Sequence, residues 1–101
     1  MGKVVAEVTV VPLGTSSASL SAYVAEVARV LKAFPRLKSM LTPMSTILEG
    51  EMDDVVEAVK AMHEAPFRMG AMRVSTTLRI DDRRDKKITM AGKLNAVKRK
   101  F

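Results

Sequence analysis

The sequence contains no cysteine and only one histidine, His63. Without cysteine there is no disulfide, CxxC redox pair, iron–sulfur centre or thiolate zinc site, and one imidazole does not build a histidine metal cluster. We therefore expect neither a metal nor a cofactor. Because no nucleophile stands at a recognisable spacing from His63, its position predicts a solvent-facing histidine at a helix end, favourable to the helix dipole.

Long apolar runs are also missing, since no stretch approaches the roughly 18 residues of a membrane-spanning helix. Lys3 is followed directly by a strand-like run and not by the pattern of a signal peptide. These features predict a cytoplasmic protein without membrane contact. Glutamine is absent and Asn95 is the only asparagine, a depletion typical of thermophilic proteins, although the eight methionines are not.

Length and charge limit the classes of protein that remain possible. A chain of 101 residues builds one modest core, so we expect a single domain over 1–101. The net charge is +6, and residues 81–101 carry most of it, with eight basic and three acidic side chains. A basic segment of this kind binds nucleic acid or anionic lipid in some proteins, but a short charge run is more often a solvated surface. The four aromatic residues lie outside the predicted strands, so RNA recognition by base stacking is not expected.

The hydrophobic periodicity changes several times along the chain. Alternation of period two predicts strands at 4–11 and 73–80, and two β-prone runs at 37–41 and 45–49 predict a hairpin. Helical periodicity predicts one helix that starts at a Ser17 or Ser19 cap and stops at Pro35. It predicts a second helix that begins after Gly50 and ends before Pro66, and a short C-terminal helix capped by Thr89.

This βαββαβ order predicts an α+β fold, the ferredoxin-like sandwich, in which a four-stranded antiparallel sheet carries two helices on one face. The other face of the sheet is then bare. On the two longest strands it shows Val5, Glu7, Thr9, Val11, Arg73, Ser75, Thr77 and Arg79. Such a mixed surface predicts self-association, as a dimer or tetramer, with room for a small ligand.

The residues alone leave several roles open. The PLGTSS segment at 12–17 either holds an anion or a polar ligand edge before a helix N-terminus, or forms an ordinary turn. Glu7 and Glu49 either pair across the sheet with Arg73 or Arg79, or accept hydrogen bonds from a ligand. Methionines such as Met40 and Met44 either fill the core or line a pocket.

Four segments of the chain resemble the small YkoF-like thiamine-binding protein family of archaea, bacteria and yeast. They are PLGT at 12–15, LTPMSTILEGE at 41–51, HEAPFRMGAMRVSTTLRIDDRRD at 63–85 and MAGKLNAVKRK at 90–100. The resemblance implies a ferredoxin-like subunit that pairs into dimers and tetramers and binds thiamine or its hydroxymethylpyrimidine part without catalysis. The ligand-binding residues that it implies are Pro12, Leu13, Gly14, Thr15, Thr46, Glu49, Arg73 and Thr76.

Two other functions stay open at this stage. One is a structural or regulatory module that binds another protein or nucleic acid through the basic C-terminal segment. The other is a weak hydrolase or transferase with Glu49 as its base.

Overall fold

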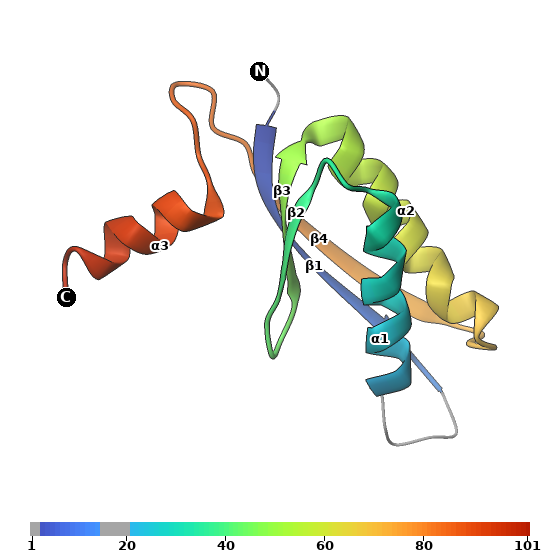
Figure 1. Cartoon of the computed structure of the whole chain (residues 1–101). Helices are drawn as coiled ribbons and strands as arrows, with labels where there is room; N and C mark the ends of the chain where they lie inside the picture. The colour runs from blue at the N-terminus through green and yellow to red at the C-terminus, as the bar shows by residue number, and fades with distance from the viewer. Residues whose placement is uncertain (1–2, 15–20) are drawn as a thin grey trace.

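The computed structural model describes residues 3–14 and 21–101 (Figure 1). Its elements, in chain order, are β1 (Lys3–Pro12), α1 (Ser21–Val30), the 3-10 turn η1 (Leu31–Ala33), β2 (Lys38–Leu41), β3 (Thr46–Glu51), α2 (Met52–Arg68), β4 (Val74–Asp81) and α3 (Met90–Lys98). The four strands form one sheet in the order β2-β3-β1-β4, and every neighbouring pair is antiparallel. This is the predicted ferredoxin-like arrangement, and the fold class is confirmed.

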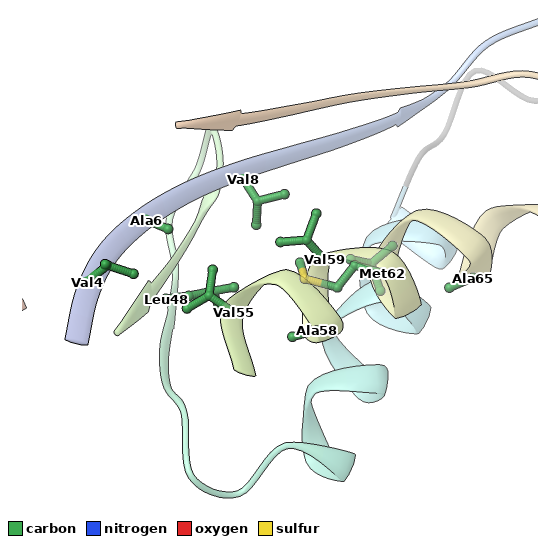
Figure 2. Packing of buried hydrophobic residues seen from close by; sticks show 10 residues of the cluster. Val4, Ala6, Val8, Leu48, Val55, Ala58, Val59, Met62 and Ala65 are labelled. Atoms are coloured by element: carbon green, nitrogen blue, oxygen red, sulfur yellow. The ribbon is translucent and has the colours of Figure 1, made fainter. Parts of the chain in front are cut away.

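The core lies between one face of the sheet and the helices α1 and α2. Alternate residues of β1 point to this face, and Leu48 of β3 joins them (Figure 2). Helix α2 contributes a stripe at helical spacing, in which Val55 and Met62 are almost completely buried (Figure 2). Burial of these apolar side chains is the main stabilising term for a domain of this size.

The predicted end of the second helix is wrong. We expected it to stop before Pro66, but α2 continues through Pro66 to Arg68. Proline lacks the N–H that would donate to the preceding turn, yet Pro66 and its neighbour Ala65 are buried against the core. The Pro66 carbonyl also accepts from the N–H groups of Met69 and Ala71 at 3.1 and 3.0 Å, which closes the helix end. Burial and these bonds outweigh the local helix-breaking tendency.

The first helix ends earlier at its C-terminus than its periodicity predicts. Helix α1 ends at Val30 and continues as the tighter turn η1 to Ala33, just before Phe34 and Pro35. The predicted serine cap at Ser17 or Ser19 lies outside the described residues.

Helix α3 is the third helix of the fold, and it lies on the other side of the sheet from α1 and α2 (Figure 1). Its predicted cap is confirmed, because the Thr89 hydroxyl accepts from the Gly92 N–H at 2.9 Å. We call the sheet face on the α3 side the open face. Within residues 3–14 and 21–101, no helix is both long enough and apolar enough to span a membrane.

Candidate ligand-binding site

Cross-strand pairing arranges the open face in rows that run across the sheet. The first row that spans all four strands consists of Lys38, Glu49, Val5 and Asp81, and the pair Lys3 and Glu51 precedes it at the start of β1. The second row consists of Met40, Ile47, Glu7 and Arg79. Two further rows, towards the end of β1, pair Thr9 with Thr77 and Val11 with Ser75. In the second row the apolar side chains therefore lie on β2 and β3 and the charged ones on β1 and β4, while the first row has Val5 between two acidic side chains.

A hollow of about 290 Å³ lies between the first two rows and α3. Its apolar lining comes from the sheet and from one side of α3, and it includes Val5, Met40, Ile47, Met90 and Leu94. Its charged lining consists of Glu7, Arg79, Asp81 and Lys93. An apolar cleft with a few converging polar groups is the usual form of a small-molecule site, and this volume is at the lower end of the usual range.

Two contacts hold α3 over the hollow. The backbone N–H of Met90 donates to Oε1 of Glu49 at 2.7 Å, and Nζ of Lys93 lies 2.5 Å from Oδ2 of Asp81. Both carboxylates belong to the first row of the sheet. The wall that α3 gives to the hollow is thus fixed by polar contacts at its N-terminal end.

Glu7 and Arg79 face each other directly across β1 and β4 in the second row. Oε2 of Glu7 accepts from the Ser45 hydroxyl at 2.9 Å. No ion pair within 4.0 Å joins Glu7 or Glu49 to Arg73 or Arg79 among the described residues, so the cross-sheet pairing that we considered is not formed there. Both charges of the second row therefore remain available to a ligand in the hollow.

Half of the predicted site residues lie at the other end of the sheet. The Leu13 N–H donates to the Arg73 carbonyl at 2.8 Å, which brings Pro12, Leu13, Gly14 and Arg73 together where β1 ends. Gly14 has φ of 71°, the left-handed conformation that favours glycine. With the usual rise of a strand, this turn lies about 20 Å along β1 from Glu7. Thr15 lies outside the described residues.

The other three predicted residues are separated from one another. Thr46 lines a second hollow of about 180 Å³ beside α1 and the β2–β3 hairpin, where Met44 also lies. Thr76 faces α2, and its hydroxyl lies 2.7 Å from Nδ1 of His63. Glu49 alone lies beside the larger hollow, where it contacts α3.

His63 differs from its prediction as a solvent-facing residue at a helix end. It is half-buried five residues before the end of α2, where its ring packs edge-on against Phe67 with centroids 5.5 Å apart. Within the described ranges no group of three or more His, Asp or Glu side chains forms a metal site.

Sequence reasoning did not name most residues of the larger hollow as ligand-binding. Strand alternation placed Val5, Glu7 and Arg79 on the open face, and the β2–β3 register adds Met40 and Ile47 to it. That alternation was the signal that could have found the floor of the hollow. No pattern in the sequence around α3 predicts that this helix forms a wall of the hollow, because its position depends on contacts with distant residues.

Comparison with known proteins now gives the family. A sequence profile described as thiamine-binding protein matches residues 6–98, nearly the whole chain. The chain belongs to the thiamine-binding protein family. The resemblance stated from the sequence is confirmed.

Relatives in this thiamine-binding protein family occur in bacteria and archaea. The chain is 48% identical over 96 residues to the UPF0045 protein YqgV of Bacillus subtilis, covering 92% of each chain. It is 48% identical over 99 residues to a UPF0045 protein of Methanothermobacter thermautotrophicus, covering 97% of this chain and 99% of that one. The crystal structure of the hypothetical protein MJ1052 of Methanocaldococcus jannaschii superposes with a TM-score of 0.86 at 41% identity, over 96% of this chain and 97% of that one.

Proposed function

We propose that the protein is a non-catalytic, homo-oligomeric binding protein that holds thiamine or a related hydroxymethylpyrimidine in the hollow between the open face and α3. The observation that carries this proposal is the lining of the hollow, which combines apolar side chains from the sheet and α3 with four charged ones. Membership of the thiamine-binding protein family supports the choice of ligand class.

The chemistry of thiamine matches the two rows of the hollow. Its aromatic rings would lie on the apolar side chains of Met40 and Ile47. The carboxylate of Glu7 would face the thiazolium cation or accept from the amino group of the pyrimidine. Next to Glu7, on the neighbouring strand β4, the guanidinium of Arg79 would hold the phosphate of a phosphorylated form.

Binding without turnover agrees with what the carboxylates contact. A catalytic base must reach the proton that it removes, but Oε1 of Glu49 already accepts from the Met90 backbone. The histidine is engaged with Thr76 on the α2 side of the sheet. We propose that this binding role involves neither metal nor cofactor.

The rest of the open face supports self-association. The N-terminal half of α3 borders the first two rows, whereas Thr77 and Ser75 of the other rows are exposed. A second copy of the chain would cover these rows and narrow the entrance to the hollow, since closed symmetric assemblies are the usual way to bury such a face. We propose a dimer, or a tetramer built from dimers.

The basic C-terminal segment is a weaker candidate for the main activity. Arg83 pairs with Asp85 at 2.6 Å and Arg84 with Asp82 at 2.9 Å, so part of its positive charge is balanced locally. The Arg84 guanidinium holds the pKa of the Asp82 carboxyl below its ordinary value, which keeps this pair charged. These pairs reduce the field that would attract a nucleic acid backbone.

Calorimetric titration with thiamine, its phosphates and hydroxymethylpyrimidine tests the proposal. We expect Glu7→Gln to weaken thiamine binding about tenfold or more, because a charged partner is lost, and to affect uncharged hydroxymethylpyrimidine much less. The control is Glu64→Gln, which changes an exposed carboxylate of α2. Absence of heat with every ligand at millimolar concentration would contradict the proposal. Salt-sensitive binding of RNA or DNA in its place would favour the basic segment.

A further inference from the structure

Glu49 is the one charged side chain that is buried among the described residues, with 8% of its surface exposed. A buried carboxylate is costly unless hydrogen bonds compensate for the lost water. Oε1 of Glu49 accepts from the Met90 N–H at 2.7 Å, while Oε2 lies 3.9 Å from Nζ of Lys38, at the limit of an ion pair. The Lys38 side chain is itself mostly exposed. The strongest contact of this carboxylate is therefore with the first turn of α3.

Apart from the Glu49 contact, helix α3 is held against the body by the half-exposed Lys93–Asp81 ion pair and by little else. None of its residues is buried, and its apolar side chains Leu94 and Val97 are 48% and 53% exposed. The Cα radius of gyration is 14.7 Å, above the roughly 13 Å of a compact domain of this length. Figure 1 shows α3 extending away from the sheet. Its position therefore depends mainly on its N-terminal end.

The charge of Glu49 suits this contact. The first N–H groups of a helix lack partners within the helix, and the N-terminal end of the dipole is positive. Thr89 satisfies the Gly92 N–H, and Glu49 satisfies the Met90 N–H. One residue from the local sequence and one from the sheet thus satisfy two of the first three N–H groups of α3.

From these contacts we infer that Glu49 is a positioning residue, which fixes α3 over the sheet so that Met90, Lys93 and Leu94 form a wall of the hollow. Glu49 is not among the residues that line the hollow, so it acts on the ligand through α3 and not by contact. Loss of its carboxylate leaves the half-exposed Lys93–Asp81 ion pair to hold the helix, so that α3 moves more widely and that side of the hollow opens to water. The effect on ligand affinity rests on the proposed function, whereas the effect on α3 does not.

The position of α3 is measured without ligand by spin labels. The chain has no native cysteine, so cysteines introduced at the exposed positions Lys60 and Lys98 are the only labelling sites. Dilution with excess unlabelled protein restricts the measured distances, by double electron–electron resonance, to one chain. We expect a narrow distance distribution with Glu49 present and a broad one in Glu49→Leu, which removes charge and acceptor. Glu49→Gln keeps an acceptor oxygen without the charge and should lie between them.

Thiamine affinity of the same variants, without labels, tests the link to the site. We expect at least a tenfold loss in Glu49→Leu and a smaller loss in Glu49→Gln. The matched control is Glu51→Gln, two residues along β3, where the carboxylate is exposed. Far-UV circular dichroism checks that each variant is folded, and Glu49→Gln decides the matter if Glu49→Leu does not fold.

Each outcome has one meaning. A distribution that stays narrow without the carboxylate overturns the positioning role, whatever happens to affinity. A broad distribution with unchanged thiamine affinity overturns the link between α3 and the ligand. If the unsubstituted protein binds no thiamine, the proposed function fails, and the distances alone still decide whether Glu49 positions α3.

Discussion

Two glutamates of the open face, Glu7 and Glu49, differ in their burial and in their hydrogen-bond partners. Glu7 is half-buried beside the hollow and accepts one hydrogen bond from Ser45, so it retains capacity for a ligand. Glu49 is buried and accepts from the N-terminus of α3. Their positions in the strand pattern are equivalent, and only the residues that fold over them separate their roles.

A substitution of Thr76 tests how much its contact with His63 of α2 contributes to stability. Thr76→Val removes the partner of His63 Nδ1, and we expect the free energy of unfolding to fall by about 1 kcal/mol. Urea unfolding measures this change. Ligand affinity should stay the same, since Thr76 faces α2. The control Thr77→Val alters the next residue of β4, which is exposed on the other face. Lost ligand binding with unchanged stability would instead place Thr76 in the binding site.

Arg79 tests which ligand charge the hollow accepts. If its guanidinium holds a phosphate, Arg79→Gln should weaken binding of thiamine phosphates about tenfold and leave thiamine itself nearly unaffected. Parallel calorimetric titrations measure both affinities. Arg68→Gln, at the exposed end of α2, controls for the loss of one positive charge. An equal loss for both ligands would contradict the phosphate contact.

At the scale of elements, the sequence pattern predicts the strands as the structure has them, but it does not predict every helix end. Period-two alternation was enough to locate β1 and β4, because each has one face against the core. The end of α2 could not be read from Pro66, since burial keeps the helix intact beyond it. The α3 cap at Thr89 was predictable because capping is a local interaction.

The α3 cap yields a prediction at this scale. Thr89→Ala removes the acceptor of the Gly92 N–H, and loss of such a cap costs about 1 kcal/mol of helix stability. We expect the Gly92 amide to exchange hydrogen about fivefold faster, as followed by NMR. The melting temperature should hardly change, because α3 buries no side chain in the core. A large fall in melting temperature would show that α3 stabilises the whole fold.

For the whole molecule, the two faces of the sheet differ in what packs against them. One face carries α1, α2 and the core, while the other carries the hollow and α3 (Figure 1). A change on the open face should therefore affect assembly or binding more than stability.

Thr77 tests this separation. Thr77→Asp places a charge on the exposed part of the open face, and in an interface it would be desolvated without a partner. We expect the dissociation constant of the oligomer to rise at least tenfold in analytical ultracentrifugation, with little change in the melting temperature. Ala25→Asp adds the same charge to the exposed side of α1 as the control. Unchanged association would exclude this part of the open face as the interface.

The sequence by itself determined the order of elements, the fold class, the face of each long strand and the family, because periodicity, caps and motifs are carried by residues close together in the chain. Only the tertiary structure decided that the turn with Pro12 to Gly14 lies about 20 Å from Glu7 along β1. It also decided that Thr76 faces His63 and that Glu49 holds α3. These facts depend on strand register and on contacts between residues far apart in the chain, such as Leu13 with Arg73 and Glu49 with Met90, for which the chain has no local signal.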